Sequence, residues 1–218
     1  MKRLVPALAL ALVLLLPSQA TAATNVWFFY GAGPHFWSSG IDEMARKAQS
    51  LRGVGRVSTH DHMETQRVYD EILASPTSDR AVVVGYSCGG NASLAVAQGL
   101  ARNGRPVAVL AVQPSVWCGR YLPTTSNVRY AQDTYGNCVQ TLGLGCLQFY
   151  GDAYKTVNIY RPDLHLEADT DPNSQRDVLG AIYAIANPNR VGPLLRHLHR
   201  TTYITRYNGQ NVWRLRER

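Results

Sequence analysis

A serine stands between two glycines at the end of an apolar run, in the segment RAVVVGYSCGG. Ser87 is the central residue of Gly85-Tyr86-Ser87-Cys88-Gly89, which matches the pattern G-x-S-x-G. The valines before it predict a buried strand, and NASLAVAQGLARNG after it predicts a helix. A serine on the sharp turn between such elements has its hydroxyl lifted clear of the sheet, which suits a nucleophile. The alternative interpretation is an ordinary loop serine.

A nucleophilic serine that attacks an acyl carbon needs donors for the oxyanion that develops. The backbone N–H of Cys88 is the first candidate, because it follows the serine at the start of the predicted helix. The second donor is expected from the loop after the first strand, FYGAGPHFWSSG. There the N–H of Ala32 or of Gly33 could serve, since a glycine-rich backbone can approach a substrate closely.

A serine hydroxyl also needs a base to take its proton. Of the six histidines, His165 is the candidate base, because it follows the predicted last strand KTVNIY and precedes the last helix. His35 lies in the candidate oxyanion loop. His60 and His62 resemble half of a metal site but have no partner ligand at a suitable spacing, so loop positions are expected for them.

The residue that orients the histidine is expected after one of the strands that follow Ser87. Asp133 ends the predicted strand NVRYAQD and gives the chain order Ser87, Asp133, His165. Asp152, in the loop before the last strand, is the alternative. Asp133 could instead cap a turn.

From residue 24 on, the chain alternates predicted strands and helices, which predicts an α/β fold with a single, mostly parallel sheet of about six strands and helices on both faces. The Asn-Gly pair in YITRYNGQNVWRL predicts a basic C-terminal β-hairpin at about 201–218. The predicted strands lie in 25–33, 55–62, 80–87, 105–114, 127–133 and 155–160, and the predicted helices in 40–51, 63–75, 91–104 and 171–187.

Residues 1–23 have the features of a secretory signal peptide: a basic start, an apolar run and the small-residue site Ala20-Thr21-Ala22. One domain, 24–218, would follow, in a periplasm or outside the cell. Disulfides are permitted there, and the four cysteines allow three pairings. Cys138 and Cys146 flank the shortest loop, which would leave Cys88 with Cys118. The pairing stays open at this point.

The formal net charge is +7, and the basic residues are concentrated towards the C-terminus. Weak contact with an anionic surface is therefore expected, whereas no aromatic stacking motif indicates nucleic acid. The oligomeric state does not follow from the sequence.

The segments VVVGYSCGG, FFYGAG with IDEMARKA, and NIYRPDLHL together resemble the α/β-hydrolase superfamily. The likeness is to its small lidless bacterial serine esterases and thioesterase-like proteins, with an elbow similar to that of cutinases. It covers roughly residues 25–187 and implies a serine hydrolase of carboxylic esters that needs no metal or organic cofactor. Its substrate would be a small or polymer-borne ester.

One departure from these relatives concerns the acid. They often carry Asp-Pro after the strand that follows the serine, whereas this chain has Gln113-Pro114. The resemblance therefore implies that Asp133 takes the orienting role, or that the triad is degenerate and the protein is a binding or envelope-associated protein. The segment between VLAVQP and NVRYAQD is too short for a cap domain, so an open site is expected.

Overall fold

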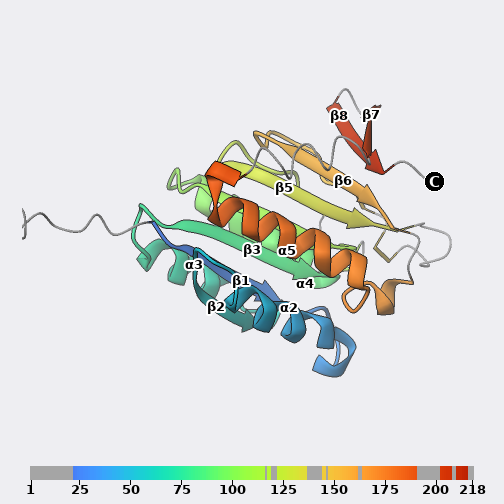
Figure 1. Cartoon of the computed structure of the whole chain (residues 1–218), viewed down its shortest axis with the longest axis horizontal. Coiled ribbons are helices and arrows are strands. Elements are labelled where there is room, and N and C mark those ends of the chain that lie inside the picture. Colours follow the sequence, from blue (N-terminus) through green and yellow to red (C-terminus); the bar gives the residue numbers. More distant parts are fainter. Residues whose placement is uncertain are drawn as a thin grey trace, which may run out of the picture.

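The computed structural model describes residues 22–115, 117–118, 122–136, 144–145, 147–161, 164–190, 202–207 and 210–215. One six-stranded sheet has the order β2-β1-β3-β4-β5-β6, with all neighbouring strands parallel (Figure 1). Its strands are β1 (Thr24–Phe29), β2 (Val54–His60), β3 (Arg80–Tyr86), β4 (Val107–Val112), β5 (Val128–Tyr135) and β6 (Thr156–Tyr160). The predicted α/β fold is confirmed.

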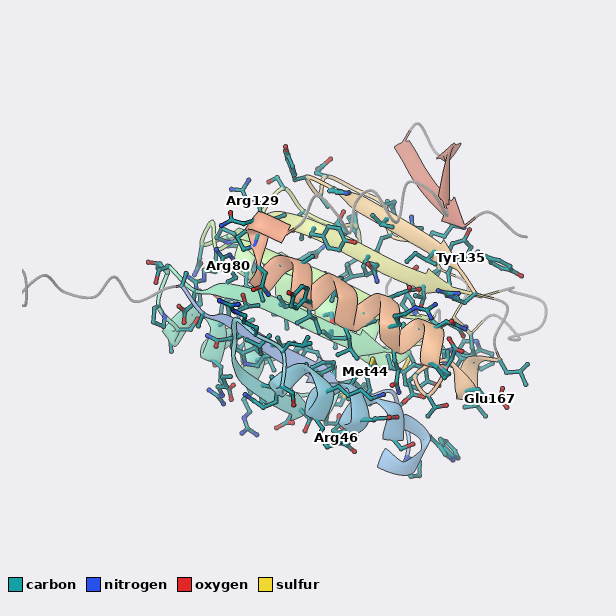
Figure 2. All side chains as sticks on the ribbon, in the orientation of Figure 1. Met44, Arg46, Arg80, Arg129, Tyr135 and Glu167 are labelled. Carbon is teal, nitrogen blue, oxygen red and sulfur yellow. A yellow bond between two sulfur atoms is a disulfide. The ribbon has the colours of Figure 1, made fainter. Side chains whose placement is uncertain are left out.

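Helices cover both faces of this sheet. The α-helices are α2 (Ser39–Gln49), α3 (Thr65–Ala74), α4 (Cys88–Ala101) and α5 (Pro172–Ala186), and the short 3-10 helices are η1 (His35–Ser38), η2 (His165–Glu167) and η3 (Pro188–Arg190). Helices α2 and α5 pack on one face, and α3 and α4 pack on the other. Figure 2 shows Met44 of α2 on the face shared with α5, where it is fully buried.

The valine run of β3 serves both cores because successive side chains of a strand point to opposite faces. Val82 and Val84 pack towards α2 and α5, whereas Val83 packs towards α3 and α4. A central strand buried on both sides therefore has no polar alternation, as its sequence indicates.

The described C-terminal part of the chain follows the sequence expectations. Asp171 is the N-cap of α5, and its side chain accepts a hydrogen bond of 2.6 Å from the Ser174 N–H. Strands β7 (Thr202–Tyr207) and β8 (Gln210–Leu215) pair antiparallel beside β6, which agrees with the predicted hairpin. The turn Asn208-Gly209 and residues 1–21 of the predicted signal peptide lie outside the described residues. None of the described helices is both long and apolar enough to cross a membrane.

Candidate active site

Ser87 occupies a strained turn between β3 and α4. Its backbone has φ 52° and ψ −120°, and its N–H donates to the Val112 carbonyl at the end of β4. A non-glycine residue at positive φ costs roughly 1–3 kcal/mol, and such strain is found where neighbouring structure enforces it for function. The turn places the hydroxyl above the carboxyl end of the sheet, as the G-x-S-x-G pattern predicts.

The flanking glycines are required by close backbone contacts. A Cβ on Gly85 would lie 2.0 Å from the Gly89 carbonyl oxygen, and a Cβ on Gly89 would lie 2.5 Å from the Phe29 carbonyl oxygen. Neither partner is the end of a flexible side chain, so neither contact can relax cheaply. These two glycines therefore allow α4 to begin directly against β1 and β3.

His165 stands at the first position of η2, just beyond the end of β6, and its ring reaches the serine. Its Nε2 lies 2.8 Å from the Ser87 Oγ. The ring stacks on Tyr86, with 5.2 Å between the centroids, and the Tyr86 hydroxyl donates to the His165 carbonyl at 2.6 Å. The structure therefore brings together the predicted nucleophile and base, and it fixes the histidine through its ring and its backbone.

The other ring nitrogen of His165 faces Gln113 rather than a carboxylate. The Gln113 Oε1 lies 3.2 Å from the His165 Nδ1. An amide oxygen only accepts hydrogen bonds, so this contact places the proton on Nδ1 and leaves the Nε2 lone pair towards Ser87. Gln113 has φ 46°, a second strained position at the same edge of the sheet.

A short segment of the described chain covers this contact. Gly145, at φ 70°, lies so close that a Cβ there would be 2.6 Å from both the Gln113 Oε1 and the His165 Nδ1. Burial of the ring lowers the His165 pKa to about 4, because a charged imidazolium loses its hydration there. The His165 ring is therefore neutral above about pH 4.

The prediction that Asp133 orients His165 is not met by the geometry. Strand β5 continues to Tyr135 (Figure 2), so Asp133 lies inside the sheet, in register with Ala111 and Asn158. Both its carboxyl oxygens are buried without a hydrogen-bond partner among the described residues, and burial raises its pKa well above the ordinary value. Because Asp133 lies within β5, before the carboxyl end of the strand, its side chain does not occupy the position beside the His165 Nδ1 that Gln113 takes.

The alternative acid, Asp152, is also far from this role. It precedes β6, whereas His165 follows β6, so the two residues belong to opposite ends of the same strand. The Asp152 N–H donates to the Thr124 carbonyl at 2.9 Å, and its side chain is exposed.

Two of the three candidate oxyanion donors, Cys88 and Ala32, line the same pocket as Ser87. Cys88 is the first residue of α4, so its N–H has no carbonyl within the helix to bind. Ala32 lines the same pocket as Ser87, whereas Gly33 is not among the described lining residues. The loop that carries Ala32 and Gly33 is held by the Gly31 N–H, which donates to the Ser38 hydroxyl at 3.1 Å.

A carboxylate from the histidine segment holds the helix that follows this loop. Asp169 is fully buried and accepts a hydrogen bond of 2.9 Å from the Gly40 N–H at the start of α2. Burial raises the Asp169 pKa to about 6, although bonds from backbone N–H groups oppose the rise. Asp169 thus connects the segment that carries His165 to the segment that carries Ala32.

Cys88 and Cys118 form a disulfide, with Cα atoms 5.2 Å apart. This agrees with the pairing that the loop lengths favoured, while Cys138 and Cys146 lie outside the described residues. The bridge ties the residue after the nucleophile to the loop that follows β4.

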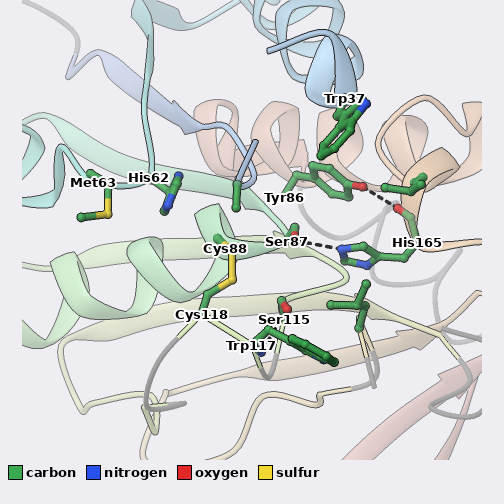
Figure 3. A pocket seen from close by; sticks show the side chains of 13 residues that line it. Trp37, His62, Met63, Tyr86, Ser87, Cys88, Ser115, Trp117, Cys118 and His165 are labelled. Carbon is green, nitrogen blue, oxygen red and sulfur yellow. Dashed lines mark hydrogen bonds between the residues drawn. A yellow bond between two sulfur atoms is a disulfide. The ribbon is translucent and has the colours of Figure 1, made fainter. Parts of the chain in front are cut away.

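Ser87 opens into a pocket of about 590 Å³ (Figure 3). Most of its walls come from residues that the sequence did not single out. The described lining residues are Ala32, Trp37, His62, Met63, Tyr86, Ser87, Cys88, Ser115, Trp117, Cys118, Leu144, His165 and Leu166. Gln113 carried a sequence signal, since it stands where related sequences place an acid. Wall residues such as Trp37, Met63 and Trp117 come from separate segments without a recognisable pattern.

Neither a scan against protein-family models nor a search of curated proteins found a match to this sequence. Several solved structures resemble the chain. Human thioesterase 2 has 10% identity and a TM-score of 0.48, covering 76% of this chain and 98% of its own. Est1E from Butyrivibrio proteoclasticus has 12% identity and a TM-score of 0.49, covering 78% and 89%. A serine hydrolase without a lid from Xanthomonas campestris has 16% identity and a TM-score of 0.44, covering 79% and 85%.

The chain's own architecture defines its fold. It combines a parallel sheet, helices on both faces, a serine elbow after β3 and a histidine after the last strand of that sheet. This is an α/β-hydrolase fold.

Proposed function

We propose that this protein is an exported serine hydrolase that cleaves carboxylic esters through an acyl-enzyme. The observation that carries the proposal is the 2.8 Å contact between the His165 Nε2 and the Ser87 Oγ on a strained elbow. A base in hydrogen-bond reach of a serine at a helix start is the arrangement that nucleophilic acyl transfer requires.

The reaction follows from these positions. His165 takes the Ser87 proton as the hydroxyl attacks the acyl carbon, and the N–H groups of Cys88 and Ala32 bind the oxyanion. His165 then returns the proton to the leaving alcohol. A water molecule, activated by the same ring, attacks the acyl-enzyme and releases the acid. Each oxyanion donor is expected to contribute about 3 kcal/mol to lowering the barrier.

Gln113 supports this chemistry without supplying a charge. Its amide oxygen holds the productive tautomer of His165, which is half of what a carboxylate does in a triad. It stabilises the imidazolium of the transition state only as a dipole, so slower turnover than with a carboxylate is expected. Export is supported by the predicted signal peptide and by the Cys88–Cys118 disulfide, since structural disulfides persist in oxidising compartments.

The test is labelling of the folded protein with a fluorophosphonate probe, followed by peptide mapping and assay with p-nitrophenyl acetate. Labelling is expected at Ser87 only. Ser87→Ala should abolish it and lower turnover by roughly 10⁴-fold or more. Ser115→Ala is the matched control, because Ser115 is another serine of the same pocket and should leave the Ser87 peptide labelled. An unlabelled wild-type protein would instead favour a catalytically degenerate binding protein.

A further inference from the structure

Most of the described residues that line the pocket around Ser87 have apolar or aromatic side chains. Among its described lining residues there is no aspartate, glutamate, lysine or arginine. Its polar side chains are the two histidines and the serines, and His165 and Ser87 are already bonded to each other. Apart from His62, the described lining residues offer no ionisable side chain that is not already bonded, so a charged substituent would lose its hydration for little gain.

The apolar residues of this pocket are also unusually exposed. Met63 is 78% exposed, Trp117 73%, Leu166 64% and Trp37 49%. The other exposed large apolar or aromatic residues of the described chain, Leu73, Tyr150, Tyr154 and Leu164, do not line it. Exposed apolar side chains that gather around one hollow mark a surface that is covered when a ligand binds.

Two tryptophans form facing walls, and neighbouring residues contact the ring of Trp37 and the backbone of Trp117. Trp37 packs on the loop backbone at Gly33, where φ is 95° and a Cβ would lie 2.6 Å from its ring. Trp117 is followed by Cys118 of the disulfide, and its N–H donates to the Ser115 hydroxyl at 3.1 Å. Figure 3 shows Trp37 on one side of Ser87 and Trp117 on the other. The Trp37 ring, packed in this way, loses little entropy on binding.

The chemistry of the site assigns a direction to the substrate. The leaving oxygen must face the His165 Nε2, which gives it a proton. The alcohol half of an ester therefore lies on the His165 side, where Leu166 also lines the pocket. Figure 3 shows His62 and Met63 on the side of Ser87 opposite His165. We call this part of the pocket the Met63 arm, and it is left for the acyl half of the ester.

We propose that the substrates are uncharged esters with apolar groups on both sides of the carbonyl, the acyl chain lying along the Met63 arm and the alcohol along Leu166. This inference rests on the proposed hydrolase function and narrows its substrate class. Each methylene that becomes buried should raise kcat/KM roughly fourfold until the arm is filled.

The experiment compares two ester series below their micelle concentrations. p-Nitrophenyl esters from acetate to dodecanoate vary the acyl chain, and alkyl acetates from ethyl to octyl vary the alcohol. kcat/KM should rise with chain length in both. Met63→Ala should flatten the acyl series alone, and Leu166→Ala the alkyl acetate series alone. Leu73→Ala, an exposed leucine of α3 outside the pocket, is the matched control and should change neither series.

A terminal charge supplies the converse test. An acyl chain of six carbons that ends in a carboxylate should react at least roughly tenfold more slowly than the uncharged hexanoate. Equal rates for the two esters, or flat series with Ser87-dependent hydrolysis of the acetate, would overturn this inference and leave the hydrolase function standing.

If no ester is cleaved, the function fails but the pocket is still tested. Ser87→Ala protein is then titrated with 1-decanol and 1-butanol while tryptophan fluorescence is followed. Saturable binding of decanol that is weakened in Met63→Ala or Leu166→Ala supports an apolar site, whereas no binding of decanol overturns it.

Discussion

Gln113 is the residue that most distinguishes this site. It stands at the end of β4 with positive φ and accepts from the His165 Nδ1, so it has the position of a triad acid without the charge. Burial makes the imidazole hard to protonate, and the uncharged amide facing its Nδ1 does not offset this, so the His165 pKa is lowered to about 4. Activity should therefore persist in acid, because the base stays neutral down to about that pH.

Gln113→Glu should reverse this property. A carboxylate next to Nδ1 favours the imidazolium, so the His165 pKa rises and the acidic limb of the kcat/KM profile moves up by roughly one to three pH units. The plateau rate should also increase, since the transition state carries that imidazolium. Gln113→Met is the uncharged control: it should lower the rate at every pH without moving the limb. An unmoved limb in the glutamate variant would contradict the orienting role of this position.

Asp133 should affect stability and not turnover. Its folded-state pKa is raised by burial, so the native state holds the proton more tightly than the unfolded chain. Stability is then lost as the pH rises from the ordinary aspartate range towards the raised pKa. Asp133→Asn should remove this loss, giving a higher free energy of unfolding than wild type at about pH 8 and little difference at about pH 3, as urea titrations would show.

The same Asp133→Asn variant tests whether Asp133 or Gln113 orients His165. It should keep kcat/KM for p-nitrophenyl acetate within about twofold, because Asp133 makes no hydrogen bond to His165. The exposed Asp152→Asn serves as the control for the mutation itself. A large loss of turnover in Asp133→Asn alone would restore Asp133 as the triad acid.

At the scale of the elements, the elbow between β3 and α4 is linked to the loop after β4 by a disulfide. The loop after β4 begins with Gln113, carries Trp117 and returns to the elbow through the Cys88–Cys118 disulfide. The disulfide thus ties Cys88, next to Ser87, to the loop that carries both Gln113 and Trp117.

Loss of this disulfide should weaken both the fold and the site. The cysteines are 30 residues apart, and closing a loop of that length is expected to contribute roughly 3–4 kcal/mol. The variant with both Cys88→Ala and Cys118→Ala should lose about that much in urea unfolding and also lose kcat/KM as Trp117 is released. A reductant should have the same effect on wild type. If the double variant matches oxidised wild type in both the free energy of unfolding and kcat/KM, the disulfide stabilises neither the fold nor the site.

At the scale of the whole molecule, the parallel sheet collects the site at one edge. Ser87 follows β3, Gln113 follows β4 and His165 comes after β6, so residues distant in sequence meet where the carboxyl ends of the strands lie. The basic charge lies elsewhere in the sequence: residues 191–218 contain six arginines and one glutamate.

The charged C-terminal segment should give the protein weak affinity for anionic surfaces without affecting catalysis. Each arginine near such a surface contributes about 1 kcal/mol, and added salt weakens the attraction. A full-length variant with these arginines changed to glutamine should lose cosedimentation with phosphatidylserine vesicles and keep ester turnover. Equal binding of both proteins, or equal binding to neutral vesicles, would contradict this. The arginines are Arg196, Arg200, Arg206, Arg214, Arg216 and Arg218.

The sequence by itself determined the order and type of the elements, the elbow at Ser87 and the candidacy of His165. These depend on local periodicity, on glycines that a tight turn requires and on chain order, all of which can be recognised in one sequence. Only the tertiary structure showed that Gln113, and not Asp133, faces the His165 Nδ1, because this depends on where β5 ends and on which side chain reaches the sheet edge. The pocket walls were likewise decided by tertiary contacts, since Trp37, Met63, Trp117 and Leu166 come from separate segments that only long-range packing brings to the same serine.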